Sequence, residues 1–199
     1  MNEKLSPKDK FLVAFTEMFP DFRVESISVD KIPTEAMEYF IRKSECFRPE
    51  GSYSPEDFIE AYKVLRGEGS YTTYIVKEIK EIKDYGFEED TYFADVDEQG
   101  ELIGTSELRY KPDSDKEFFK DKPFLGNIRT NPNFLRQGFG IRRIELMDGF
   151  SRIQYQNPLY SDEINSEEMI AVWEKLVADG RASKTQLSDD EGDVRYAMI

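Results

Sequence analysis

The 199-residue sequence contains no histidine and a single cysteine, Cys46. Without an imidazole, the chain cannot use histidine as a general base or as a metal ligand. One thiol allows no internal disulfide and no multi-cysteine zinc site, which is typical of a reducing compartment. Cys46 lies in an apolar context that favours a helix, so we interpret it as a core residue rather than a nucleophile. We therefore expect no metal site.

Long apolar runs are also missing. No stretch approaches the ~20 apolar residues that a membrane-spanning helix needs, and the N-terminus has no apolar core of a signal peptide. We therefore expect a cytoplasmic protein with no membrane partner. Hydrophobic residues still make up 39% of the chain and aromatic residues 14%, which is enough apolar surface to form one folded core.

Basic residues are outnumbered, with 27 Lys and Arg against 41 Asp and Glu, for a formal net charge of −14. Such a surface repels phosphate backbones, so we expect no direct binding of nucleic acid. The simplest interpretation is that the charge keeps the protein soluble. An acidic inhibitor that mimics nucleic acid and occupies a basic groove is an alternative that the charge leaves open.

Hydrophobic periodicity and helix-capping residues predict several amphipathic helices. We expect them to start at Ser6-Pro7, at Pro33, at Ser54-Pro55, after Gly140, and at Asn165 or Ser166. The first helix should stop at Pro20, the third at Gly67 and the last at Gly180. The Glu-rich stretches near 78–90 and at 189–191 are interpreted as solvated faces.

Runs of alternating or β-branched residues predict strands between these helices. The expected strands are 22–29, 71–86 with less regular spacing, 91–97, 101–110, 124–130, 158–161, 182–187 and 194–199. Glu98-Gln99-Gly100 is typical of a hairpin turn. Interleaved helices and strands favour one mixed α/β layer domain over residues 21–199, preceded by a helical extension over residues 1–20.

The segment Asn131-Pro132-Asn133-Phe134-Leu135-Arg136-Gln137-Gly138-Phe139-Gly140 lies between a predicted strand and a predicted helix. Glycines at such a turn let backbone N–H groups converge on an anion, and the helix N-terminus adds its positive dipole end. Arg136, Arg142 and Arg143 supply positive charge in an otherwise acidic chain. The segment is neither a Walker loop nor a dinucleotide-binding turn, because it lacks both spacings. It therefore predicts a diphosphate site.

The loop resembles the Arg/Gln-x-x-Gly-x-Gly/Ala motif of the GNAT N-acetyltransferases, which follows a strand ending in an apolar-x-Pro step and precedes a helix. The resemblance implies a mixed, mostly antiparallel central sheet flanked by helices, with the N-terminal helix as an addition. It also implies acetyl-CoA as co-substrate. The backbone around Arg136, Gln137, Gly138, Phe139 and Gly140 would hold its pyrophosphate, and the strand near Ile128 and Thr130 would pair with its pantetheine arm.

Two positions depart from the family pattern. Leu135 stands where Arg or Gln is usual, with Arg136 beside it. Trp173 stands where the family often has the tyrosine that reprotonates the coenzyme thiolate, and an indole cannot do this. Trp173 also lies on an apolar helical stripe, so we interpret it as a core residue. A catalytically silent module of this fold that binds a partner is therefore a second alternative.

If the chain is an enzyme, the reaction implied by the resemblance is acetyl transfer to an amine. A carboxylate must then take the amine proton, and Glu107 is our candidate base, with a solvent-facing strand residue as the alternative interpretation. Tyr160 is our candidate acid, ahead of Tyr155. The acidic surface favours a cationic amine of a small molecule, or a basic protein segment, as acceptor. A homodimer is one of the assemblies that these expectations allow.

Overall fold

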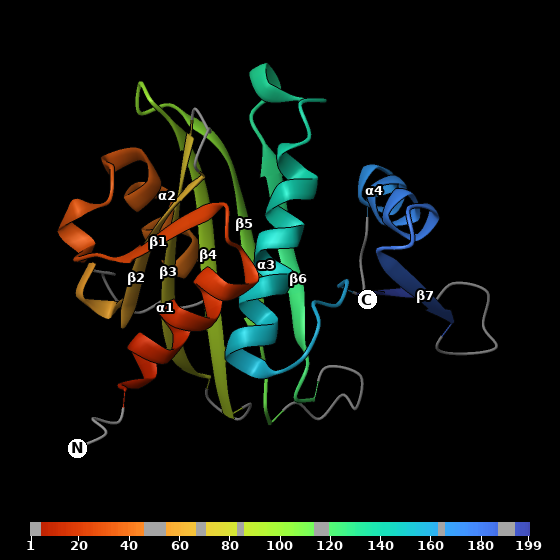
Figure 1. Ribbon diagram of the computed structural model, residues 1–199, viewed down its shortest axis with the longest axis horizontal. Coiled ribbons are helices and arrows are strands. Elements are labelled where there is room, and N and C mark those ends of the chain that lie inside the picture. The colour runs from red at the N-terminus through yellow and green to blue at the C-terminus, as the bar shows by residue number, and fades with distance from the viewer. Residues whose placement is uncertain are drawn as a thin grey trace.

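The computed structural model describes residues 5–45, 55–66, 71–82, 86–113, 120–162, 166–186 and 194–199. Its helices are α1 (Pro7–Met18), α2 (Thr34–Glu45), α3 (Phe139–Tyr155) and α4 (Glu167–Ala178). Its strands are β1 (Phe22–Ser26), β2 (Glu60–Arg66), β3 (Tyr71–Ile82), β4 (Gly86–Asp97), β5 (Leu102–Tyr110), β6 (Pro123–Thr130), β7 (Ala182–Gln186) and β8 (Val194–Met198). The chain thus has the mixed α/β fold that its sequence predicts, shown in Figure 1.

The central sheet is a six-stranded meander in which β1 to β6 follow one another in chain order and every pair is antiparallel. A second pair, β7 and β8, is joined to the large sheet through one residue. Tyr160 bridges Phe124 of β6 in parallel and Ala197 of β8 in antiparallel orientation. The predicted strand at 158–161 is therefore reduced to this short bridge, whereas the two predicted C-terminal strands are confirmed as β7 and β8, which pair antiparallel.

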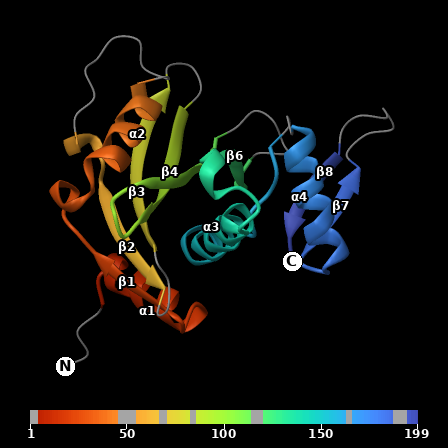
Figure 2. The same ribbon diagram turned by 90° about the horizontal axis from the view of Figure 1, so that it is seen from above.

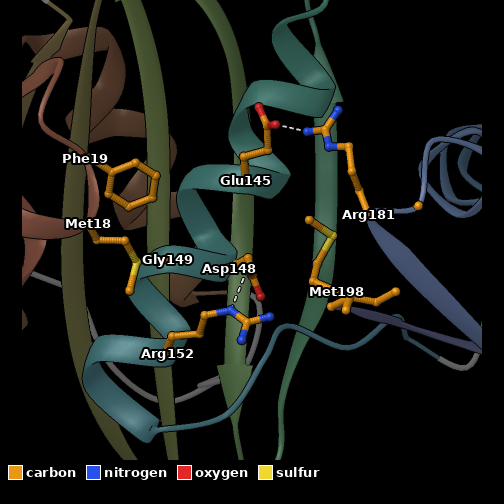
Figure 3. A pocket seen from close by; sticks show the side chains of 10 residues that line it. Met18, Phe19, Glu145, Asp148, Gly149, Arg152, Arg181 and Met198 are labelled. Carbon is orange, nitrogen blue, oxygen red and sulfur yellow. Dashed lines mark hydrogen bonds and ion pairs between the residues drawn. The ribbon is translucent and has the colours of Figure 1, made fainter.

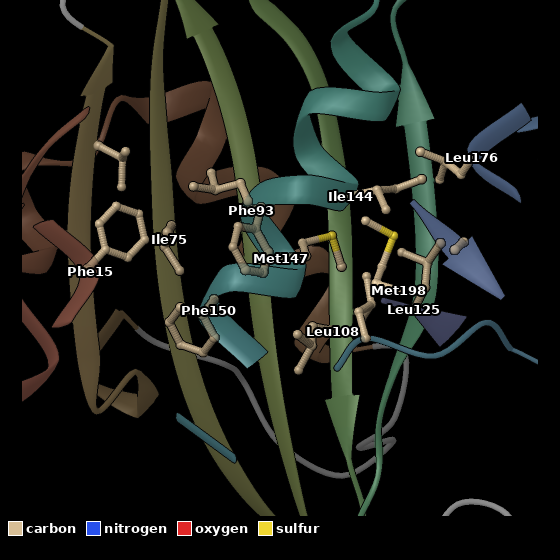
Figure 4. Packing of buried hydrophobic residues seen from close by; sticks show 14 of the residues in the cluster. Phe15, Ile75, Phe93, Leu108, Leu125, Ile144, Met147, Phe150, Leu176 and Met198 are labelled. Carbon is tan, nitrogen blue, oxygen red and sulfur yellow. The ribbon is translucent and has the colours of Figure 1, made fainter. Parts of the chain in front are cut away.

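Helices cover both faces of the large sheet, as seen from above in Figure 2. Helices α1 and α3 pack on one face, where Phe15, Phe93 and Phe150 belong to one hydrophobic cluster (Figure 4). Helix α2 packs on the other face, where Phe40 and Tyr92 belong to a second cluster. We call these the α3 face and the α2 face. This layering explains why the strands between them are buried on both sides.

Local signals account well for the helix ends. Ser6 and Asp9 form a reciprocal capping box at α1, and the Ser166 hydroxyl accepts from the Met169 amide at α4. Helix α1 was expected to be an extension separate from the domain, and this division remains a prediction. Its Phe11 and Phe15 side chains lie in the same cluster as α3.

The predicted helix between Ser54 and Gly67 is wrong. Only a short 3₁₀ turn, Pro55–Asp57, precedes strand β2. Ala61 faces the α2 cluster, whereas Tyr62 and Val64 face the α3 cluster. A strand that is buried on both faces does not alternate between polar and apolar residues. The spacing of its apolar residues can therefore match that of a helix.

The Glu-rich stretch near 78–90 is not a solvated face. Lys80 is 2% exposed, and its ammonium lies 2.6 Å from both Glu78 Oε1 and Asp90 Oδ2. The Tyr92 hydroxyl donates to Glu78 Oε1 at 2.6 Å. These side chains form a buried polar network below α2, which offsets the cost of burying the charges by pairing them. The network joins side chains of β3 and β4, and this pairing between strands could not be predicted from the order of the charged residues in the sequence.

Trp173 is fully buried and stacks on Tyr196, with ring centroids 5.7 Å apart, so its interpretation as a core residue is confirmed. Cys46, Asn165 and the stretch 189–191 lie outside the described residues. No helix among the described residues is long and apolar enough to cross a membrane.

Candidate active site

The outer edge of β6, the edge away from β5, is paired only at the start of the strand, where it meets the segment at Tyr160. At its start, the Leu125 amide donates to the Tyr160 carbonyl at 2.8 Å and the Tyr160 amide donates to the Pro123 carbonyl at 3.0 Å. The β5–β6 register then shifts, because Leu108 pairs with Leu125 but Glu107 pairs with Asn127. Gly126 is therefore an extra residue, and such a bulge bends a strand. Beyond it, none of the described strands pairs with this edge of β6.

The bulge leaves an open backbone edge on β6. The Asn131 amide donates inward to the Ile103 carbonyl at 2.8 Å. Since amides alternate between the two sides of an antiparallel strand, those of Ile128 and Thr130 point away from β5, toward the open edge. These are the two positions predicted to meet the pantetheine arm. They offer main-chain groups to an extended ligand.

The predicted anion loop directly continues this edge. A 3₁₀ turn at Pro132–Phe134 is capped by Asn131, whose side chain accepts from the Asn133 amide at 3.1 Å. The backbone is left-handed at Arg136, with φ of 63°, and at Gly138, with φ of 82°. Gly138 is the N-cap of α3, a place where glycine avoids the strain that a side chain would bring. Arg136, Gln137 and Gly138 are exposed.

The first turn of α3 is free to hold an anion. Its first helical hydrogen bond runs from the Arg142 amide to the Gly138 carbonyl at 3.1 Å. The amides of Phe139, Gly140 and Ile141 therefore have no partner within the helix. No side chain caps this end and no acidic residue lies in its first turn. The dipole and the amides together favour a bound phosphate.

Three arginines were expected to supply positive charge at the anion loop, and for Arg143 this prediction is wrong. It is 1% exposed, and its Nη1 donates to Asp95 Oδ2 at 2.7 Å on the inner side of α3. Helical geometry explains the difference, since consecutive residues project about 100° apart. Arg142 is exposed and lies over the Phe139 ring, 5.6 Å from its centroid. Leu135 is 55% exposed.

Glu107 lies on the α2 face of β5 and is fully buried rather than facing solvent. Its Oε1 accepts from Arg109 Nε at 2.7 Å, and its Oε2 lies 3.9 Å from Lys43 Nζ. Within the described part of the chain, Oε2 has no hydrogen-bond donor. Glu107 pairs with Asn127, so it lies level with the bulge at Gly126, beyond which the outer edge of β6 is open.

Tyr160 lies at the base of the same opening. Its bridge partner Phe124 pairs with Arg109, which places Tyr160 on the α2 face with Glu107. Lys122 Nζ lies 5.6 Å from the centroid of its ring. Tyr155 is less suitable as an acid, because burial raises the pKa of its phenol well above the usual value. Its ring stacks on Tyr110, 4.3 Å between centroids.

A cavity of about 600 Å³ opens beside this end of the sheet, between α2 and the ends of β5 and β6. We call it the α2 cavity. Its wall includes Tyr39 and Lys43 from α2, Thr105 from β5 and Arg129 from β6. Burial raises the pKa of Tyr39 to about 12, so its hydroxyl stays protonated at neutral pH. The sequence predicted α2 but not this cavity, although Tyr39 and Lys43 are four residues apart on one helical face.

A second cavity, of about 530 Å³, lies against the outer side of α3 (Figure 3). Its rim carries ion pairs between Arg152 and Asp148, 2.8 Å apart, and between Arg181 and Glu145. Because these charges already satisfy one another, this cavity offers less to a charged ligand than the α2 cavity and the loop.

No family model matches the chain, and no curated protein matches its sequence. Several solved structures are similar to this chain, and those described here are acetyltransferases or acyltransferases. They include an acetyltransferase of the GNAT family from Staphylococcus aureus, at 10% identity and a TM-score of 0.41, covering 55% of this chain and 66% of that one.

Two further similar structures cover more of the chain. A protein assigned as an acyl-CoA N-acyltransferase from Klebsiella pneumoniae is 10% identical, with a TM-score of 0.42, over 89% of this chain and 98% of that one. A mutant of spermidine N-acetyltransferase from Vibrio cholerae is 14% identical, with a TM-score of 0.38, over 90% and 92%. All three TM-scores lie below 0.5.

Proposed function

We propose that the chain is an acetyl-CoA-dependent N-acetyltransferase. The observation that carries this proposal is the continuity of the open β6 edge with the uncapped start of α3. The amides of Ile128 and Thr130 would pair with the pantetheine arm. Gln137, Gly138, Phe139 and Gly140 would hold the pyrophosphate with main-chain amides, and Arg136 would add a charge-assisted contact.

The residues present fit this co-substrate. The left-handed Gly138 keeps the approach to the first turn of α3 clear, since apart from its two chain neighbours the nearest side-chain atom, Arg142 Nε, would be 4.0 Å from a Cβ at this position. A diphosphate would meet free amides and no carboxylate in that turn. Acetyl-CoA would supply the activated acetyl group.

The proposed reaction requires one bond to form and one to break. The neutral amine nitrogen of the acceptor attacks the thioester carbonyl, the carbon–sulfur bond breaks, and coenzyme A leaves as a thiolate. The amine proton passes to Glu107, directly or through one water, and the thiolate takes a proton from Tyr160. The acceptor would be an amine of a small molecule or of a basic protein segment.

A coenzyme-binding module without turnover is the second candidate. The complete burial of Glu107 and Trp173 favours it, because neither side chain is exposed to a substrate. The exposed Leu135 in the first motif position favours it as well.

Turnover separates the two candidates. The parent protein, incubated with acetyl-CoA and a panel of polyamines, amino sugars, amino acids and lysine-rich peptides, should release free coenzyme A thiol with at least one acceptor. Tight coenzyme binding without any thiol release would favour the silent module. Absence of coenzyme binding would remove both candidates and favour the acidic-inhibitor hypothesis.

A further inference from the structure

The α2 cavity differs in charge from the rest of the molecule. The chain has a net charge of −14, yet Arg42, Lys43 and Arg129 all line this cavity, and no acidic residue is among the described residues of its wall. Cations gathered in a concave site concentrate the positive potential there. The local charge therefore favours an anionic ligand, whereas the total charge favours a cationic one.

Arg129 projects toward the α2 face, because it pairs with Thr105, next in line to Glu107 on that face. No carboxylate among the described residues forms an ion pair with its guanidinium. Lys43 has only the loose contact of 3.9 Å with Glu107. Both cations can thus take an anionic partner without giving up a close ion pair.

Neutral donors complete the wall. The Tyr39 hydroxyl is hydrogen-bonded to Thr105, and burial holds it in its protonated form. A guanidinium, an ammonium and a phenol side by side form the donor set that recognises a carboxylate or a phosphate group. The volume of about 600 Å³ suits a small molecule.

We infer that the α2 cavity is the acceptor site of the proposed acetyltransferase and that the acceptor is a small amine bearing a carboxylate or phosphate group. This inference rests on the proposed function. The anionic group would lie against Arg129 and Lys43, and the amine would lie toward Glu107, level with the Gly126 bulge. Arg129 and Asn127, the register partner of Glu107, are two residues apart on β6. This separates the two ends by roughly 7 Å.

That spacing selects a compact acceptor whose amine and anion are a few bonds apart. The two proposed ligands also lie on different faces of the sheet. The pyrophosphate loop opens at the start of α3, on the α3 face, whereas Arg129 and Lys43 belong to the α2 face. The cavity and the loop meet only at Thr130–Pro132.

Calorimetric titration in the presence of saturating coenzyme A tests this inference. The probes are matched pairs: phosphoethanolamine against ethanolamine, and β-alanine against its amide. The anionic member of at least one pair should bind about tenfold more tightly or better, the effect of one charge-assisted contact. Which pair responds distinguishes a phosphate from a carboxylate acceptor.

Arg129→Gln should remove that difference and leave coenzyme A affinity unchanged. Arg23→Gln is the matched control, since Arg23 lies on β1 at the opposite edge of the sheet and pairs with Glu25. It should change neither affinity.

Three results would overturn the inference. Equal binding of the charged and neutral members would show that the cavity does not select anions. A loss of coenzyme A affinity in Arg129→Gln as large as its loss of affinity for the anionic probe would assign the cavity to the coenzyme. An anion preference that survives Arg129→Gln would place the anion elsewhere. Coenzyme A binding in the same titrations reports on the proposed function separately, so its failure is distinguishable from failure of the inference.

Discussion

Arg143 Nη1 donates to Asp95 Oδ2 at 2.7 Å, and both side chains are 1% exposed. Arg143 Nη2 also donates to the Arg129 carbonyl at 2.8 Å and to Thr130 Oγ1 at 2.6 Å. One guanidinium therefore connects α3 to β4 and to the end of β6. This connection fixes the start of α3 against the edge that we propose as the coenzyme site.

Replacing this guanidinium should destabilise the fold. Arg143→Met leaves the Asp95 carboxylate buried without its cation, which costs about 3–5 kcal/mol. The measurement is the free energy of unfolding in urea. Arg23→Met is the control, since Arg23 is 77% exposed and its pair with Glu25 should contribute about 0–1 kcal/mol. Equal losses in both variants would show that the buried pair has no special role.

The contrast between Arg142 and Arg143 shows which features of the site could be predicted from the sequence. The glycines, the proline and the apolar helix face predicted the loop and its place between strand and helix, because these are local signals. Which of Arg142 and Arg143 is exposed beside the loop depends on the rotation of α3 over the sheet, which is a tertiary property. The α2 cavity was missed for the same reason, since its residues come from three elements.

The buried network below α2 predicts a dependence of stability on alkaline pH. Burial, together with the nearby Asp90 and Glu78 carboxylates, raises the pKa of Tyr92 above its usual value. In the unfolded chain this phenol ionises near pH 10, so above that pH the unfolded state binds fewer protons and stability falls by roughly 1.4 kcal/mol per pH unit.

Tyr92→Phe should lose about 1–3 kcal/mol at neutral pH, because it removes the three hydrogen bonds of the Tyr92 hydroxyl. It should lose less stability than the parent between about pH 10 and 11, because its side chain cannot ionise. Urea denaturation at both pH values measures this. A parallel decline in parent and variant would contradict the account of Tyr92.

Trp173 should contribute to stability rather than to catalysis. Trp173→Ala removes a fully buried indole stacked on Tyr196 and should cost about 3–5 kcal/mol. Ile170→Ala, on the same helix but 41% exposed, is the matched control and should cost far less. A melting temperature of Trp173→Ala close to that of the parent would contradict the packing.

Glu107 is the proposed base, and Glu107→Gln tests it. The variant keeps the shape of the side chain but accepts a proton poorly, so turnover should fall at least ~100-fold while acetyl-CoA affinity is kept. Glu88→Gln is the control, since Glu88 is also buried and lies 3.9 Å from Arg109. An equal fall in both variants would show that the charge network, rather than a base, limits the rate.

The central claim is that the loop before α3 holds the coenzyme. Titration of acetyl-CoA into the parent protein and into Gly138→Glu tests it most directly. The new side chain must adopt a φ of 82° and places a carboxylate at the uncapped helix start. Gly100→Glu is the control, because Gly100 has a φ of 90° in the β4–β5 turn, with open space around it.

The account predicts a calorimetric binding signal for the parent and for Gly100→Glu, and a loss of affinity of at least about tenfold for Gly138→Glu. Equal affinity for acetyl-CoA in a folded Gly138→Glu variant, or no binding by the parent protein, would contradict it.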